Sequence, residues 1–295
     1  MPLVLGCFAL GVLLRRVAPR THQMSRLLDR SVISVFLPAL VLAKLPEIPF
    51  EARAAIPVAV AWGGVAVGAV TILALARLRG WDRKTTGTLL LVTPLGNTSF
   101  LGLAAVEALL GRDHLPPALA FDQLGSFLAL VTYGSFVASR YGGGSGSNNA
   151  APALRDAWTF PPFVALLVGI ALRAAGFELP APDVFDAAGR LVGPVALTSL
   201  GLRFTLDVSR RLIEPAAACL TVRMALIPAL ALAASTLAGG GLEWSTAVVE
   251  AGAPPMVTAG VVAAGVGLDA ELAVTVVGFG LLLALGTLPL LAFLV

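Results

Sequence analysis

Two long apolar segments of this chain are interrupted at their middles by proline and glycine. The first interruption, at residues 94–102, reads PLGNTSFLG, and the second, at residues 252–260, reads GAPPMVTAG. Proline has no backbone N–H and its ring clashes with the preceding helical turn, so an apolar helix that contains it leaves backbone groups unpaired. Within a bilayer such groups are tolerated only where they are buried in protein or line a wet cavity. Paired interruptions therefore indicate a binding site of the kind that transporters build.

The composition identifies the solvent of the chain as the lipid bilayer. Hydrophobic residues make up 58% of the 295 residues, charged residues only 13%, and the mean hydropathy is +0.91. A soluble domain of this length could not bury so much apolar surface, so we expect an all-α integral membrane protein. The apolar N-terminus precedes Arg15 and Arg16, the reverse of the order in a cleavable signal peptide, which predicts a retained first helix. Cys7 and Cys219 lie far apart in apolar runs and are expected to be free thiols.

Charged and Pro/Gly-rich stretches divide the chain into ten expected membrane spans. A polar, flexible linker at residues 141–157 separates a first five-helix repeat at 1–140 from a second at 158–295. The expected spans are residues 1–17, 27–46, 54–78, 86–110, 115–139, 158–176, 188–206, 212–238, 243–266 and 270–294.

The distribution of basic residues predicts the orientation of these spans. If the spans alternate in direction, the loops after spans one, three, five and seven hold most of the 20 Lys and Arg residues. The positive-inside rule then places these loops and the linker in the cytoplasm and both termini outside the cell (inner) membrane. This topology accounts for the basic pI of about 9.3 without nucleic acid. The opposite side receives Lys44, Arg53, Arg112, Arg173 and Arg190.

An odd number of spans in each half gives the two halves opposite orientations, which is the inverted repeat of many secondary transporters. At a constant sequence offset, identical residues occur at equivalent helix interruptions and loops of the two halves. The alternative is that unrelated proline kinks occur in ordinary membrane helices, where Pro and Gly are common. The matched pairs are Pro38 with Pro194, Gly96 with Gly252, Gly111 with Gly267, and Asp113 with Asp269.

Three motifs carry a resemblance to a known family. They are FLPALVLAKL at residues 36–45, GNTSFLGL at 96–103, and EAGAPPMVTAGVVAAGVGLDAELA at 250–273. With these motifs the chain resembles the auxin efflux carrier family, which includes bacterial malonate and malate permease-like members and is similar in fold to the bile acid sodium symporters. Plant members have a proline directly before the Asn that matches Asn97, whereas this chain has Gly96 there and Pro94 two positions earlier.

The resemblance implies an architecture of two inverted five-helix repeats. Spans one, two, six and seven would form a scaffold, and spans three to five and eight to ten a transport domain. Spans four and nine would cross at their breaks near the middle of the membrane, with the substrate bound beside the crossing. Pro38 and Pro194 would kink scaffold helices at the boundary between the domains.

The broken segments predict the chemistry of the substrate. Exposed N–H groups at the start of each half-helix carry partial positive charge and favour an anion such as a carboxylate. The first segment offers polar side chains for recognition and the second mainly a backbone break, although Thr98 and Ser99 could simply cap a half-helix. Asn97 and Gln123 are substrate contacts by resemblance to the family. The predicted substrate-binding residues are Asn97, Thr98, Ser99, Gln123, Pro254, Pro255 and Thr258, with helix-break residues Pro94, Gly96 and Gly252.

Charged residues at membrane depth form a second group of candidates. Each costs about 2.5–3.5 kcal/mol at a helix centre on insertion scales and is therefore a functional hypothesis. Asp122 lies in span five and Glu250 just before the second break, where either could carry a proton. Alternatively, Arg223 in span eight forms a structural pair with a carboxylate. The sequence leaves both interpretations open.

These features predict a secondary active transporter, or a uniporter, that moves a small organic anion by alternating access of the elevator type. The alternatives are a sodium-coupled organic-acid symporter and, less favoured, a membrane-embedded enzyme. We expect no catalytic residues, cofactor or metal, since no catalytic or metal-ligand motif occurs in the sequence. The expected partners are the organic anion, a proton rather than sodium, and the lipid bilayer, with a homodimer left open and no nucleic acid.

Overall fold

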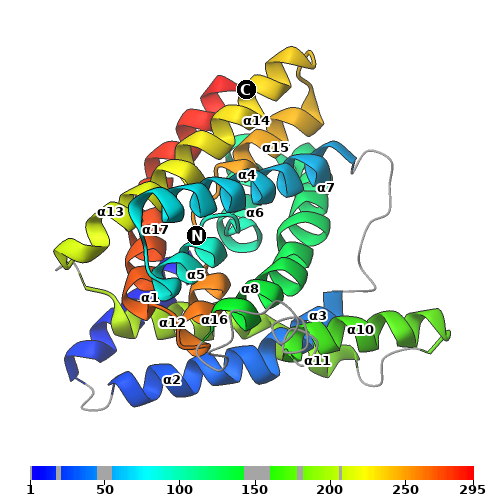
Figure 1. The fold of residues 1–295 in the computed structure, drawn as a ribbon. Coiled ribbons are helices and arrows are strands. Elements are labelled where there is room, and N and C mark those ends of the chain that lie inside the picture. Colours follow the sequence, from blue (N-terminus) through cyan, green and yellow to red (C-terminus); the bar gives the residue numbers. More distant parts are fainter. Residues whose placement is uncertain (1, 18–20, 45–54, 143–159, 178–181, 206–207) are drawn as a thin grey trace.

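The computed structural model describes residues 2–17, 21–44, 55–142, 160–177, 182–205 and 208–295 (Figure 1). Helices dominate these residues, and β-type pairing is restricted among them to one isolated antiparallel bridge between Gly96 and Pro255. The all-α class expected from the sequence is thus confirmed for the described part of the chain. The predicted linker lies, beyond Gly142, outside the described residues, as do Arg20, Arg53 and Arg155.

The first half contains helices α1 to α8. Several turns between them are wider π-helical turns rather than α-helical ones. One of these lies within the first broken segment and another follows α7. The α-helices are α1 (Pro2–Val17), α2 (Thr21–Ser31), α3 (Leu37–Lys44), α4 (Ala55–Arg79), α5 (Arg83–Val92), α6 (Leu103–Leu109), α7 (Leu115–Ala120) and α8 (Ser135–Tyr141). The π-helical segments are Val32–Phe36, Thr98–Gly102, Phe121–Phe127 and Leu130–Gly134.

The second half contains helices α10 to α17. A π-helical segment, Val222–Leu226, joins two of its helices. The α-helices are α10 (Pro161–Ala174), α11 (Pro182–Arg190), α12 (Val192–Arg203), α13 (Arg210–Thr221), α14 (Ile227–Leu237), α15 (Leu242–Ala251), α16 (Val257–Gly265) and α17 (Ala270–Leu294).

Four continuous helical segments of the described chain are long and apolar enough to cross a membrane. Large apolar side chains remain exposed on them, for example Leu237 at 90% and Phe293 at 86% exposure. In water such surfaces would be unfavourable, whereas lipid solvates them. The four segments are Ala55–Arg79, Arg112–Tyr141, Arg210–Leu237 and Ala270–Leu294.

The expected single span at residues 188–206 is wrong in detail, because the chain forms two helices there. Helix α11 ends at Arg190 and α12 begins at Val192, so that Leu191 lies in a turn. Pro194 has no N–H with which to bond the Arg190 carbonyl four residues earlier, which removes one helical hydrogen bond at this point. The turn at Leu191 is the consequence, and it places α11 as a separate element beside α3.

Helices α5 and α16 lie deepest in the molecule. Residues 86–92 of α5 and residues 257–263 of α16 are all buried. A helix that is apolar around its whole circumference must be covered by other helices, and α17 packs on both. The interrupted segments that follow α5 and precede α16 are therefore held inside the bundle rather than against lipid.

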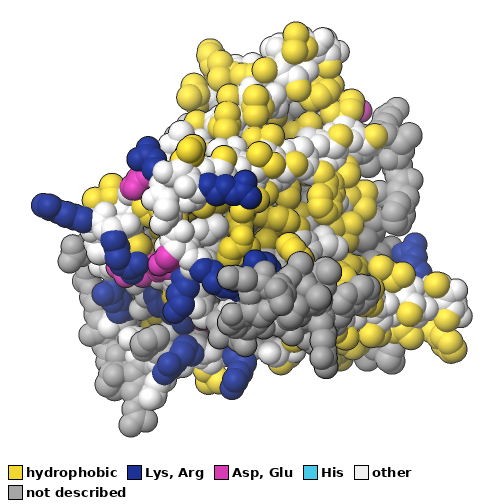
Figure 2. All heavy atoms as spheres, viewed as in Figure 1, with side chains coloured by type: hydrophobic (Ala, Val, Ile, Leu, Met, Phe, Trp, Pro, Cys, Tyr) yellow, Lys and Arg dark blue, Asp and Glu magenta, His cyan; other side chains and the backbone are white. Residues whose placement is uncertain are grey.

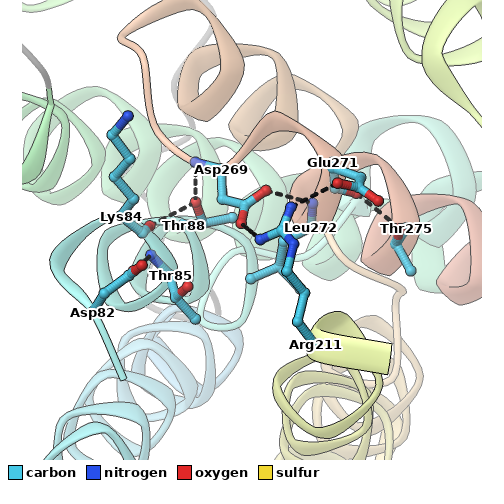
Figure 3. A network of polar contacts seen from close by, with 9 residues as sticks. All are labelled: Asp82, Lys84, Thr85, Thr88, Arg211, Asp269, Glu271, Leu272 and Thr275. Atoms are coloured by element: carbon cyan, nitrogen blue, oxygen red, sulfur yellow. Dashed lines mark hydrogen bonds and ion pairs between the residues drawn. The ribbon is translucent and has the colours of Figure 1, made fainter. Parts of the chain in front are cut away.

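A polar network joins α5, α13 and α17 at one end of the bundle (Figure 3). Arg211 donates to Asp269 over 2.7 Å and to Glu271 over 2.6 Å. Asp269 also accepts from the Leu272 N–H, and its own N–H donates to the Thr88 hydroxyl. Most Lys and Arg side chains visible in Figure 2 gather toward this end. Exposed ion pairs contribute little energy each, so the network mainly fixes how these helix ends are arranged.

The start of α5 at the same end is capped by Asp82. Its carboxylate accepts a hydrogen bond of 2.7 Å from the Thr85 N–H. This bond lowers the pKa of the Asp82 carboxyl below its ordinary value, because the backbone donor favours the charged form. Since the folded-state pKa is lowered, the stabilisation is complete above the ordinary pKa of about 3.9 and is lost as the pH falls through the lowered value.

We predict that Asp82→Ala lowers the stability of the detergent-solubilised protein by about 1 kcal/mol at neutral pH, since it removes this cap. The midpoint temperature of thermal unfolding would measure the loss. Asp82→Asn is the matched control, because Asn caps helices as well as Asp does and does not titrate. The difference between wild type and Asp82→Ala should shrink toward pH 3, and a difference that stays constant would contradict the role of the charged cap.

Candidate functional site

The two broken segments meet and satisfy each other's backbone. The Asn97 N–H donates to the Pro254 carbonyl over 2.7 Å, and the Met256 N–H donates to the Leu95 carbonyl over 2.9 Å. The bridge between Gly96 and Pro255 lies between these two bonds. Groups that the prolines exclude from a helix are thus paired across the molecule, which removes the cost of burying them alone.

Arg223 joins the same two segments from a third element. Its guanidinium donates from Nε to the Ala253 carbonyl over 2.8 Å and from Nη1 to the Pro94 carbonyl over 3.2 Å. These carbonyls lie just beyond the C-terminal ends of α15 and α5, where helix dipoles place partial negative charge. At 3% exposure, Arg223 is a buried cation that binds two helix ends. Its hydrogen bonds to the described residues go to carbonyls, not to a carboxylate.

Two glycines of the first segment leave room for charged side chains of the second half. A Cβ atom at Gly96 would lie 2.2 Å from Nη2 of Arg223, and one at Gly102 would lie 2.0 Å from Oε2 of Glu250. Both distances are far below van der Waals contact, so no side chain fits at either position without displacement. The guanidinium explains why this chain has glycine, and not proline, directly before Asn97.

Glu250 is buried at the end of α15 with 0% exposure. Neither of its carboxyl oxygens has a hydrogen-bond partner in the described part of the chain. Asp122 and Arg223 are the charged groups near enough to act on it electrostatically. An ionised carboxylate without hydrogen-bond partners is costly in such a place.

Asp122 lies on the π-helical segment Phe121–Phe127 and faces the first broken segment. Its Oδ1 atom accepts from the Thr98 hydroxyl over 2.5 Å and from the Ser99 hydroxyl over 2.6 Å. The protons of both hydroxyls therefore go to Asp122, and the Asn97 side chain makes no capping bond at the restarted helix. The predicted polar residues thus form one cluster with the acidic residue of span five.

A cavity of about 500 Å³ opens beside this cluster. Part of the polar lining comes from Asn97, Ser99, Asp122, Gln123 and Thr258, all of which we named as candidates from the sequence. Asn97 Nδ2 and Gln123 Oε1 have no partner among the described residues, so one donor and one acceptor are available to a ligand. The apolar walls are Leu37, Leu40, Phe100, Leu103, Leu119, Phe127, Leu130, Val192 and Met256.

Other predicted residues lie behind the cavity rather than in its wall. Pro254 and Pro255 contribute backbone bonding, and Thr98 acts through Asp122. Arg223 and Glu250 are likewise absent from the lining.

The sequence did not single out the part of the wall that α11 supplies. Asp186 and Arg190 line the cavity and form an ion pair with each other, and Gly189 of α11 packs against Leu40 of α3. Their spacing of four residues on a helix favours such a pair. The turn before α12 orients α11 so that Asp186 and Arg190 reach the cavity. From the sequence we expected one uninterrupted helix at residues 188–206 and therefore did not predict this turn.

The sequence of the chain is similar to those of known membrane transporters. Residues 9–292 match the model of a family described as membrane transport protein. A protein named uncharacterized transporter, from Methanothermobacter thermautotrophicus, is 29% identical over 294 residues, which cover 97% of this chain and 94% of that protein. A second uncharacterized transporter, from Methanocaldococcus jannaschii, is 30% identical over 179 residues, which cover 59% of this chain and 56% of that protein.

We predict that Gly96→Ala destabilises the protein by about 1–3 kcal/mol, the usual cost of overpacking a buried site. The added methyl group would displace the Arg223 guanidinium from the two carbonyls that it binds. Gly63→Ala in α4 is the matched control, because a Cβ there meets nothing within 4 Å. Thermal unfolding in detergent would compare the two variants, and equal stability would show that Arg223 is not held as tightly as its contacts suggest.

Proposed function

Because the chain belongs to the membrane transport protein family, we propose that it moves a small organic anion across the membrane by alternating access. This membership confirms the family that the sequence motifs indicated, and it is a family of transporters, not enzymes. The observation that carries the proposal is the cavity at the two broken segments. The Asn97 amide donor and the Gln123 acceptor there have no partner within the described part of the chain.

The cavity also supports a class of substrate. Its walls are mostly apolar, and its polar groups gather near Asn97 and Asp122. A ligand that matches both parts has a carboxylate at one end and an apolar body at the other. The Asn97 amide can donate to a carboxylate oxygen, and the ion pair of Arg190 with Asp186 adds further polar atoms to the wall.

The charges of the cavity support coupling to a proton. Asp122 lines it together with Asp186 and Arg190, which form an ion pair with each other, so an ionised Asp122 would repel an anionic ligand. A proton on Asp122 removes this repulsion when the anion binds. Glu250 lies near enough to Asp122 to interact with it electrostatically, and two neighbouring carboxyls disfavour double ionisation. A proton can therefore reside on either of the two. A sodium-coupled symporter remains the alternative mechanism.

We further propose the ten-span architecture for this function. Spans four and nine would cross where the broken segments bond to each other. The scaffold would be spans one, two, six and seven, which include α3, α11 and α12 on one wall of the cavity. The transport domain would carry Asn97, Gln123 and Thr258 on the opposite wall. The basic end of the bundle supports a cytoplasmic side there, with both termini outside.

We predict that Asn97→Ala raises the half-saturating substrate concentration about 10- to 100-fold, because a hydrogen bond to a charged ligand is worth about 1.5–3 kcal/mol. Flux of benzoate, malonate and malate into proteoliposomes would measure it. Ser235→Ala, a buried polar position away from the cavity, is the control. If no organic anion moves in the wild-type protein, or if Asn97→Ala leaves the flux unchanged, the proposed site is wrong.

A further prediction concerns coupling. A pH difference of about one unit supplies about 1.4 kcal/mol per coupled proton, equivalent to a tenfold accumulation. Asp122→Asn should abolish this gradient-driven accumulation while leaving exchange of anion at equal pH. Asp113→Asn, at an exposed position, is the matched control.

Glu250→Gln tests the second carboxyl in the same assay. Proton coupling through this pair would be excluded if both Asp122→Asn and Glu250→Gln retained accumulation driven by the pH difference. Replacement of the pH gradient by a sodium gradient would reveal the symporter alternative, since only that mechanism responds to sodium.

A further inference from the structure

A second cavity, of about 600 Å³, lies at the other end of α16. One wall is formed by α2 and the π-helical segment Val32–Phe36, and the other by the C-terminal end of α16 and the residues that follow it. The polar network around Asp269 begins directly after this wall, so the cavity belongs to the basic end of the bundle. Its lining residues are Arg26, Leu27, Asp29, Arg30, Ile33, Ser34, Ala264, Gly265, Val266 and Gly267.

The cavity is lined by two positively charged side chains that make no ion pair with the described residues. Arg26 and Arg30 lie four residues apart on α2 and so share one face of the helix. Neither forms a hydrogen bond or ion pair with another described residue. The neighbouring carboxylate, Asp29, is 2% exposed and is bound by the Ser199 hydroxyl at 2.5 Å and by Arg203 at 2.6 Å. Its charge is therefore compensated within the protein, and the two arginines remain to attract an anion.

Both cavities lie along one seam between the same helices. Leu37 lines the first cavity and Ile33 the second, one turn apart on a continuous helical stretch. On α16, Thr258 lines the first cavity and Gly265 the second, a separation of about 10 Å at 1.5 Å per residue. The two cavities therefore approach each other from opposite ends of the seam.

The material between the cavities is apolar and closely packed. A Cβ atom at Gly265 would lie 2.4 Å from Cδ1 of Ile33, so α16 approaches the other wall as nearly as its backbone permits. Water and ions do not pass such a contact, because it leaves them no polar partner. The residues of the apolar seal are Ile33, Leu37, Ala259, Val262 and Ala263, which belong to one buried cluster.

We propose that the second cavity is an anion-binding vestibule at the basic end of the substrate path, with Arg26 and Arg30 as its anion receptors. This inference rests on the proposed transport function. An organic carboxylate leaving the first cavity would reach the vestibule once the seal between α16 and the segment Val32–Phe36 opened. Clustered charge beside low-dielectric walls raises the local concentration of counter-ions by at least about tenfold, which favours carboxylates over cations.

The charge of the vestibule can be tested with Ser34→Cys, an exposed position in its lining. The background would carry Cys7→Ser, while Cys219 stays because it is fully buried. At each cysteine, the measured quantity is the reaction rate of an anionic methanethiosulfonate divided by that of a cationic one. We expect this ratio to be about tenfold higher at Ser34→Cys than at the exposed control Thr236→Cys. The paired substitutions Arg26→Gln and Arg30→Gln should abolish this preference. Equal reactivity with both reagents before these substitutions would overturn the proposed anion receptor.

The place of the vestibule on the path is tested by flux of benzoate, malonate and malate after modification. The anionic reagent should reduce flux at least about tenfold in the Ser34→Cys protein and leave it unchanged in the Cys7→Ser background, because only the former blocks the vestibule. Unchanged flux in fully modified Ser34→Cys protein would overturn the vestibule while leaving the transport function intact. A protein that moves none of these anions before modification would instead overturn the transport function, and with it the path.

Discussion

The structure depends on the bond that one buried cation makes to two helix ends. Isolated burial of a guanidinium would cost several kcal/mol, but Arg223 donates to the carbonyls of Pro94 and Ala253, where two helix dipoles end. These carbonyls lie in the two interruptions just beyond the ends of α5 and α15, where the helical hydrogen bonding stops. The carbonyls therefore compensate the buried charge of the guanidinium, and the guanidinium provides the carbonyls with hydrogen-bond donors. Gly96 is required because a side chain there would fill the space of the guanidinium.

The two broken segments have different roles around this centre. The first supplies the polar side chains, with Asn97 at the cavity and the hydroxyls of Thr98 and Ser99 on Asp122. The second supplies mainly backbone, through Pro254 and Met256. The polar side chains of the two interruptions are thus concentrated on the first segment, while the second bonds to it through its backbone.

The two cavities lie at opposite ends of one helix interface and differ in their lining. The first is lined by the polar cluster and on one side by α11, whereas the second is lined by Arg26 and Arg30 at the basic end. Only an apolar seal around Ile33 and Leu37 separates them. A membrane protein that binds an anion in its middle needs such a barrier, because an open polar path would leak ions down the membrane potential.

The sequence by itself determined the features that depend on local chemistry. Hydropathy predicted the helices, and proline and glycine predicted the two interruptions, because solvation and backbone geometry act on neighbouring residues. The polar residues 97–99 marked the first interruption as the one with side chains able to bind a ligand. Only the tertiary structure decided what occupies the space opposite each break. Arg223 beside Gly96, Glu250 beside Gly102 and Arg190 at the cavity join residues far apart in the chain. Their contacts arise from helix packing, which no local pattern specifies.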